Sequence, residues 1–80
     1  MREQILEELN VLFRKVFSDP GLAVHAGTSA PDVRGWNSLS HMLLIREVER
    51  FYGIAFSYSE VRSLRTVGDL AAVILAHLSC

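Results

Sequence analysis

The hydroxyl group of Ser38 is the first feature of this sequence that could carry chemistry. It follows Asn37 at the end of a stretch rich in Gly and Pro, and it precedes a segment with helical periodicity. A helix start has unpartnered backbone amides and a partial positive charge, so it favours an anion such as a phosphate ester on the serine. The alternative is simple capping, in which Asn37 or Ser38 accepts a hydrogen bond from one of those amides.

His41 stands three residues after Ser38, so a helix would place the two on one face as a nucleophile and its general base. No identifiable acid would orient the histidine, however, and no sharp strand-to-helix turn would present the serine. A hydrolase is therefore the weaker interpretation. The histidines at positions 25, 41 and 77 lack the close spacing of a metal site, and the sequence predicts no bound metal.

Four helical segments must position these residues. Apolar residues recur at spacings of three and four over residues 2–17, 38–52 and 67–78. A shorter helix is expected over residues 57–64, where Ser57 and Ser59 could act as caps. Because nothing resembles a strand ladder or a repeat, the sequence predicts an all-α fold in one domain.

The ends of the later helices carry recognisable signals. Gly53 is suited to the left-handed position just past the end of the 38–52 helix. Thr66 and Asp69 resemble a capping box, in which each side chain pairs with the backbone amide of the other residue. They predict the start of the last helix, whose apolar stripe consists of Val67, Leu70, Ala71, Ile74 and Leu78.

The helix expected over residues 38–52 has two different faces. At 100° per residue, Val48 lies at the centre of a face that should be buried. The other members of that face are His41, Leu44, Ile45, Phe51 and Tyr52. The opposite face consists of Leu39, Leu43, Arg46 and Arg50, with Met42 at its edge. Exposed apolar side chains in such a line indicate a contact surface for a partner.

A long loop over residues 18–37 leads to Ser38. Loops of this length are uncommon in compact domains and are often functional. We expect Leu22, Val24 and Val33 to pin it to the core. Trp36 is either a partner contact beside Ser38 or a ring that anchors the loop on the bundle.

Composition excludes several classes of protein. The 8 Lys and Arg residues nearly balance the 9 Asp and Glu residues, so bulk charge does not favour nucleic-acid binding. The longest apolar run, residues 70–76, falls far short of the roughly 20 residues that span a bilayer. No secretory signal pattern opens the chain, which predicts a cytoplasmic protein. The single cysteine, Cys80, can form no internal disulfide, and we expect it to be an inert thiol on a frayed end.

The order of these features resembles the acyl carrier protein family over nearly the whole chain. The residues that carry the resemblance are Gly35-Trp36-Asn37-Ser38-Leu39, Tyr52-Gly53-Ile54 and Leu64-Arg65-Thr66-Val67-Gly68-Asp69-Leu70. The resemblance implies a four-helix bundle with a long first loop and a short third helix, forming a single acyl carrier domain over residues 1–80. It also implies a monomeric carrier rather than an enzyme.

By position, Ser38 matches the serine that in this family receives 4′-phosphopantetheine from coenzyme A. The resemblance implies that a phosphopantetheinyl transferase attaches this arm and that its thiol holds an acyl group as a thioester. Acyl-loading, acyl-transferring or condensing enzymes are then the expected partners. They would contact Trp36, Asn37, Leu39, Met42, Leu43, Arg46 and Arg50. Acyl chains could enter between helices lined by Leu44, Ile45, Val48 and Ile74, although a packed core gives the same pattern.

Two residue choices depart from the family pattern. Asn37 replaces the usual Asp, which removes a charge that the transferase is thought to read. Arg46 and Arg50 stand on a helix that is strongly acidic in the fatty-acid carriers. Together they favour a specialised pathway, such as polyketide, lipopeptide or cell-surface acylation chemistry. An unmodified helical interaction domain is the alternative, and a peptidyl carrier, whose usual Gly-Gly-x-Ser signature is missing, has lower weight.

Overall fold

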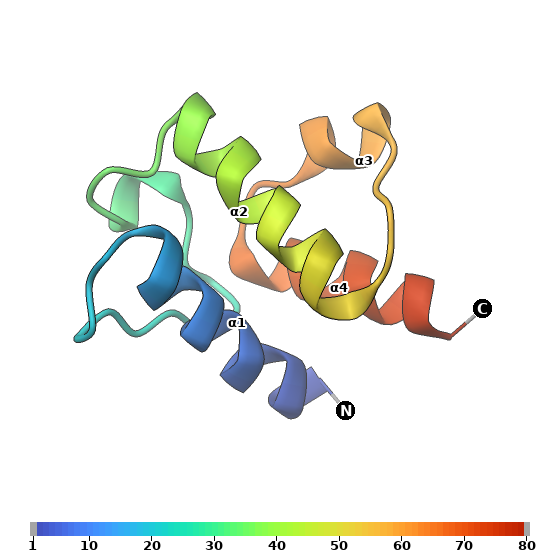
Figure 1. The fold of residues 1–80 in the computed structure, drawn as a ribbon, viewed down its shortest axis with the longest axis horizontal. Coiled ribbons are helices and arrows are strands. Elements are labelled where there is room, and N and C mark those ends of the chain that lie inside the picture. Colours follow the sequence, from blue (N-terminus) through green and yellow to red (C-terminus); the bar gives the residue numbers. More distant parts are fainter. Residues whose placement is uncertain (1, 80) are drawn as a thin grey trace.

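A computed structural model describes residues 2–79 and confirms the all-α prediction (Figure 1). Within these residues there is no strand, and one isolated bridge joins Ser29 to Thr66. None of the helices in this part of the chain is long and apolar enough to cross a membrane. The Cys80 prediction falls outside the described residues. The elements are α1 (Arg2–Val16), the 3₁₀ turn η1 (Ala30–Asp32), α2 (Ser38–Tyr52), α3 (Tyr58–Ser63) and α4 (Val67–Leu78).

The core lies where α1 packs against α2 and α4. The completely buried side chains include Phe13 of α1, Leu44 and Val48 of α2, and Ile74 of α4. The four helices begin and end within one residue of the ranges predicted from the sequence, because apolar periodicity and caps agree along the chain. The η1 turn was not predicted, since a single 3₁₀ turn has no periodicity of its own.

Two residues expected on buried faces are exposed. Phe51 is 53% exposed. Its ring packs against the Tyr52 ring in a T-shaped arrangement, with the ring centroids 4.8 Å apart. Leu78 is 43% exposed at the end of α4. Both lie in the last turn of a helix. Periodicity identifies a face but does not show how far along the helix a neighbour covers it, so these two predictions were wrong.

The long loop is fastened to α1 and α4. Val24 exchanges two hydrogen bonds with the side chain of Asn10, which donates to the Val24 carbonyl and accepts from its N–H at 3.0 and 2.7 Å. At α4, Gly68 N–H donates to the Ala26 carbonyl at 2.8 Å. Val24 and Val33 are buried and Leu22 is partly buried, as expected. These contacts fix the path that brings the chain to the start of α2.

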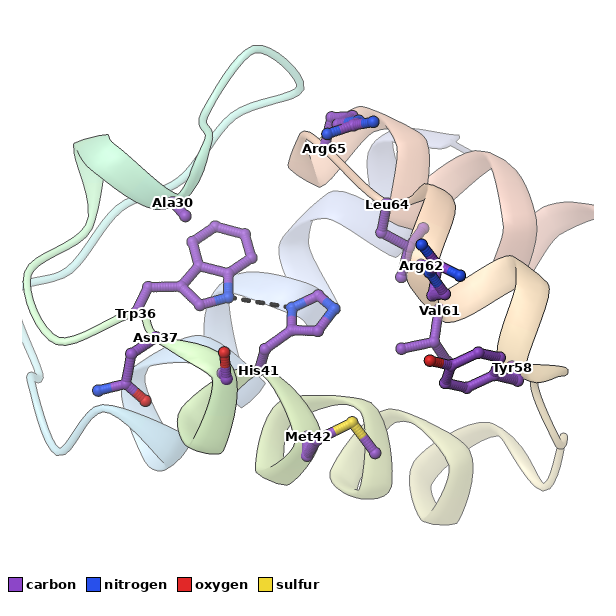
Figure 2. A pocket seen from close by; sticks show the side chains of 11 residues that line it. Ala30, Trp36, Asn37, His41, Met42, Tyr58, Val61, Arg62, Leu64 and Arg65 are labelled. Atoms are coloured by element: carbon purple, nitrogen blue, oxygen red, sulfur yellow. Dashed lines mark hydrogen bonds between the residues drawn. The ribbon is translucent and has the colours of Figure 1, made fainter.

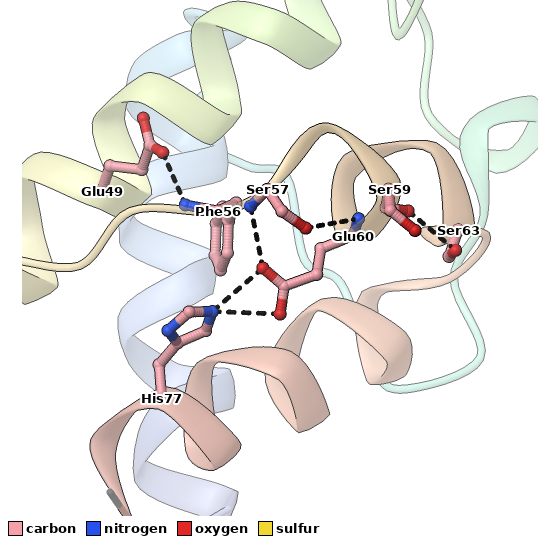
Figure 3. A network of polar contacts seen from close by, with 7 residues as sticks. All are labelled: Glu49, Phe56, Ser57, Ser59, Glu60, Ser63 and His77. Carbon is pink, nitrogen blue, oxygen red and sulfur yellow. Dashed lines mark hydrogen bonds and ion pairs between the residues drawn. The ribbon is translucent and has the colours of Figure 1, made fainter.

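A network of polar contacts helps to hold the segment around α3, whose apolar residues Ile54, Phe56, Val61 and Leu64 are partly buried against the core (Figure 3). The N–H of Phe56 donates to the Glu49 carboxylate at 2.8 Å, and Ser57 caps α3. Glu60 accepts from the N–H of Ser57 and pairs with His77 of α4 at 3.1 Å. The bond from Ser57, followed by the one from His77, lowers the pKa of the Glu60 carboxyl below its ordinary value. No residue of α3 is buried, so this helix rests on the surface of the core.

Candidate functional site at the start of α2

Asn37 and Ser40 form the capping box that begins α2. The Asn37 side-chain oxygen accepts hydrogen bonds from the N–H groups of Leu39 and Ser40, both at 3.0 Å. The Ser40 hydroxyl accepts from the N–H of Asn37 and donates to the Gly35 carbonyl, both at 2.8 Å. Of the two caps left open by the sequence, the structure therefore selects Asn37 and adds Ser40, which sequence reasoning did not single out.

Ser38 takes no part in this cap. It is the first residue of α2, its side chain is exposed, and its hydroxyl makes no hydrogen bond with any of residues 2–79. Two serines thus lie within one helical turn. Of these two, only Ser40 has a hydroxyl that forms hydrogen bonds with other described residues. The Ser38 oxygen lies in the positive field of the helix start, where an attached anion is favoured.

Trp36 anchors the end of the loop on the bundle. Its ring packs edge-on against the rings of Phe13 and Phe17, with centroid distances of 5.2 and 6.2 Å. Its indole N–H donates to Nδ1 of His41 at 3.1 Å, and the two rings are stacked 6.0 Å apart (Figure 2). The anchoring role is therefore confirmed, while a partner contact of the partly buried ring stays a prediction.

An open groove of about 470 Å³ lies beside Ser38, between the start of α2 and the α3 segment (Figure 2). Trp36 and His41 line one side of it, and Val61 and Leu64 line the other. The remaining lining residues are Ala30, Asn37, Ser38, Met42, Tyr58, Arg62 and Arg65. Sequence reasoning did not single out Tyr58, Arg62 or Arg65, because their distance from Ser38 along the chain gives no sign that α3 folds back over this site.

The Ser38/His41 pair lacks the geometry of a hydrolase. Nδ1 of His41 is bonded to Trp36, and no hydrogen bond joins either ring nitrogen to Ser38 or to a carboxylate among residues 2–79. A nucleophile needs a base within hydrogen-bond reach and a group that orients that base. Over the same residues, no group of three or more His, Cys, Asp or Glu side chains could hold a metal ion.

The outer face of α2 is apolar and exposed, as predicted. Leu39, Met42 and Leu43 are 72%, 54% and 48% exposed, and with Ile45, Arg46 and Glu49 they line a second groove of about 350 Å³. Apolar side chains gathered in this way are typical of a contact surface.

Both acids of α2 are engaged within the molecule. Glu47 pairs with Lys15 of α1 at 2.7 Å and with Arg50 at 3.6 Å. The bond from Lys15 lowers the pKa of the Glu47 carboxyl. Glu49 accepts from the backbone of Phe56. Arg46 forms no ion pair with the described residues, so it is the least compensated charge on this outer face.

One solved structure is similar to this chain over nearly its whole length. The chain is 41% identical, with a TM-score of 0.88, to the solution structure of a holo acyl carrier protein from Geobacter metallireducens. The match covers 94% of this chain and 86% of that one. The chain belongs to the acyl carrier protein family. No protein-family model and no curated protein matches this carrier.

Family membership confirms the carrier interpretation of the sequence and the four-helix fold. Acyl carrier proteins deliver groups to biosynthetic enzymes and are not enzymes themselves. The holo relative carries a covalently bound phosphopantetheine. In the present carrier, Leu44, Ile45, Val48 and Ile74 are at most 3% exposed, and none of them lines the groove beside Ser38. Of the two interpretations of that apolar set, the structure favours the packed core.

Proposed function

We propose that Ser38 is the attachment site of 4′-phosphopantetheine and that this single domain carries acyl groups between enzymes of a specialised biosynthetic pathway. When bound, the arm supplies a thiol that holds the acyl group as a thioester. The observation that carries the proposal is the exposed Ser38 hydroxyl, which stands at a helix start whose cap is completed by Asn37 and Ser40.

The residues around Ser38 fit the group. A phosphodiester on this oxygen would lie in the positive field of α2. Arg62 and Arg65 line the adjoining groove, and neither forms an ion pair with another of residues 2–79. An anion at Ser38 would therefore meet uncompensated positive charge rather than a carboxylate.

The attachment is tested by intact mass after incubation with coenzyme A and a broad-specificity phosphopantetheinyl transferase. We expect the wild-type chain to gain one phosphopantetheinyl group and Ser38→Ala to gain none. Ser40→Ala is the matched control, because it removes a hydroxyl from the same turn and should keep the modification. An unchanged wild-type mass with several transferases would contradict the proposal and support the unmodified helical interaction domain.

The residue before Ser38 is Asn37 rather than an acid. This favours a modifying transferase that does not need a negative charge at that position. Asn and Asp cap helices almost equally well, so Asn37→Asp should change the free energy of unfolding by only a few tenths of a kcal/mol. We expect the variant to be modified faster by a transferase adapted to acidic carriers. An equal rate would show that this charge is not read.

The outer face of α2 is the proposed docking surface for partner enzymes. Leu39, Met42 and Leu43 supply its apolar centre, and Arg46 and Arg50 supply its charge. Glu47 is paired with Lys15 and Arg50, and one oxygen of Glu49 accepts from the Phe56 N–H, so both acids of this helix are already partly engaged within the molecule. The complementary enzyme surface is an apolar groove edged by carboxylates, with Trp36 and Asn37 at the end nearest Ser38.

Docking is tested by titrating the modified carrier against isolated enzymes at low and moderate salt. We expect Leu43→Ala to weaken binding to the cognate enzyme more than Arg50→Ala, because Arg50 already shares the carboxylate of Glu47. The double change Arg46→Glu with Arg50→Glu should improve binding to a fatty-acid-type enzyme that prefers acidic carriers. If neither effect is seen, this face is not the docking surface.

A further inference from the structure

The outer side of α3 has an open polar hollow of about 350 Å³. Its lining residues are Tyr58, Ser59, Arg62, Ser63 and Arg65, all of them exposed. The hollow therefore combines two guanidinium groups with three hydroxyl groups, and no acid is among its lining residues. Arginine forms its strongest hydrogen bonds with phosphate and carboxylate groups, and hydroxyl groups add further donors. This composition fits a phosphate-bearing ligand.

The charges of Arg62 and Arg65 are not neutralised within the described part of the chain. Neither guanidinium group forms an ion pair there. The nearest acids along the chain make other contacts, because Glu60 pairs with His77 and the Asp69 carboxylate accepts from the backbone N–H of Arg65. An anion that reaches this side of α3 therefore meets two guanidinium groups without a competing internal carboxylate.

Tyr58 adds an exposed aromatic surface to this charge. The residue is 76% exposed, and the Arg62 guanidinium lies over its ring, 5.6 Å from the centroid. Planar bases stack on aromatic side chains, and a neighbouring arginine adds a cation–π contact. An aromatic ring beside two unpaired guanidinium groups is a combination suited to a nucleotide, with its base on the ring and its phosphates at the arginines.

The hollow on α3 adjoins the groove beside Ser38. Tyr58, Arg62 and Arg65 line both spaces, and Figure 2 shows them across the groove from Trp36. A long ligand can therefore extend from the start of α2 to the outer side of α3 while it stays in contact with the protein.

From this arrangement we propose that the outer side of α3 binds the nucleotide end of coenzyme A before the arm is attached, with the adenine on Tyr58 and the phosphates at Arg62 and Arg65. The inference rests on the proposed attachment at Ser38, because coenzyme A is the donor that must reach that hydroxyl. The nucleotide end is the part of coenzyme A that is not transferred to the serine. Its diphosphate and its 3′-phosphate complement the two guanidinium groups. The carrier thus contributes to binding its own donor.

The experiment titrates the unmodified chain, without transferase, with coenzyme A, with dephospho-coenzyme A and with pantetheine. The backbone amide resonances of residues 58–65 and the Nε–H resonances of Arg62 and Arg65 report on the site. We expect coenzyme A to shift them and pantetheine to leave them in place. Loss of the 3′-phosphate should raise the dissociation constant about threefold, as for an exposed ion pair, and moderate salt should reduce this difference. Equal effects of coenzyme A and pantetheine would overturn the inference.

Charge-removing variants localise the effect. Arg62→Gln with Arg65→Gln should abolish the preference for coenzyme A over dephospho-coenzyme A. Arg34→Gln with Arg46→Gln is the matched control, because it removes the same charge from two exposed arginines that line neither space, and it should keep the preference. Loss of the preference in both double variants would mean that coenzyme A responds to net charge alone, which contradicts a site on α3. If the first double variant fails to fold, the comparison of ligands on the wild-type chain still decides the question.

The position of the adenine has its own test. Tyr58→Leu removes the aromatic ring and keeps both guanidinium groups, so it should raise the dissociation constant for coenzyme A at least about fivefold. The preference for the 3′-phosphate should remain. An unchanged dissociation constant would contradict stacking of the adenine on Tyr58.

Failure of this inference and failure of the proposed function have different signatures. If several transferases add no arm to the wild-type chain, the proposed function itself is contradicted. If the arm attaches to Ser38 but coenzyme A leaves the resonances of residues 58–65 in place, the transferase alone binds the nucleotide and only the present inference falls.

Discussion

The bundle of α1, α2 and α4 and the segment around α3 are stabilised in different ways. The bundle buries large apolar side chains such as Phe13 and Leu44. The α3 helix has no fully buried residue, and it combines partly buried apolar contacts such as that of Val61 with polar contacts of Ser57 and Glu60. Close packing fixes a structure, while exposed polar contacts contribute little each and leave a segment adjustable. The bundle therefore sets the position of Ser38, and the less firmly held segment forms the far wall of its groove.

Truncation of the core should have the largest effect. Leu44→Ala should lower the free energy of unfolding by about 2–5 kcal/mol, because the side chain is completely buried and its removal leaves a cavity. Leu43→Ala, one residue earlier and 48% exposed, is the matched control and should cost less than about 1 kcal/mol. Urea unfolding followed by circular dichroism measures both. Equal losses would show that the two faces of α2 are not as different as described.

The attachment of the long loop to α4 should be the next most sensitive point. A Cβ at Gly68 would lie 2.8 Å from the Ala26 carbonyl oxygen, which is closer than such atoms approach. Gly68→Ala should therefore cost about 1–3 kcal/mol, despite the better helix propensity of alanine. At Gly21 a new Cβ comes no nearer than 3.7 Å to other atoms, so Gly21→Ala should be almost neutral in the same unfolding experiment.

Changes around α3 should cost less. Ser57→Ala removes the hydroxyl that accepts from the N–H of Glu60 and should lower the free energy of unfolding by about 1 kcal/mol. Ser59, also considered as a cap from the sequence, accepts from Ser63 only through its backbone carbonyl. Ser59→Ala should therefore leave stability unchanged. A loss from Ser59→Ala as large as that from Ser57→Ala would mean that the cap is wrongly placed.

The smallest effect concerns pH. The pKa of Glu60 is lowered in the folded chain, so its contribution to stability is full above the ordinary glutamate value of 4.5. That contribution is lost as the pH falls through the lowered pKa. We expect Glu60→Gln to be less stable than wild type near neutral pH and the difference to shrink in acid. Urea midpoints at several pH values measure this, and a difference independent of pH would contradict it.

Sequence reasoning located the helices because apolar spacing and caps are local signals. Thr66 and Asp69 pair as the capping-box pattern indicates, with both hydrogen bonds at 3.1 Å. The same reasoning was wrong for Phe51, since the extent to which a face is covered depends on elements far along the chain.

The candidate site was predictable in part for the same reason. Ser38 and the outer face of α2 follow from a single segment and its periodicity. Arg62 and Arg65 reach the site only because α3 folds back beside α2, which no spacing in the sequence reveals. The sequence also could not show that the Ser38 hydroxyl forms no hydrogen bond with the described residues. That depends on Ser40 completing the cap and donating to the Gly35 carbonyl across the end of the loop.

Since the cap of α2 consists of Asn37 and Ser40, the helix gains no stability from the hydroxyl of Ser38. A group esterified to Ser40 would disrupt two hydrogen bonds of the fold, whereas one esterified to Ser38 disrupts none. Modification at Ser38, as proposed, would therefore remove no hydrogen bond on which the fold depends, and the helix dipole would favour the added anion. If Ser38 is the attachment site, the unmodified and the modified chain would both keep the complete cap of α2, and neither would be exposed to proteases or chaperones by the loss of that cap.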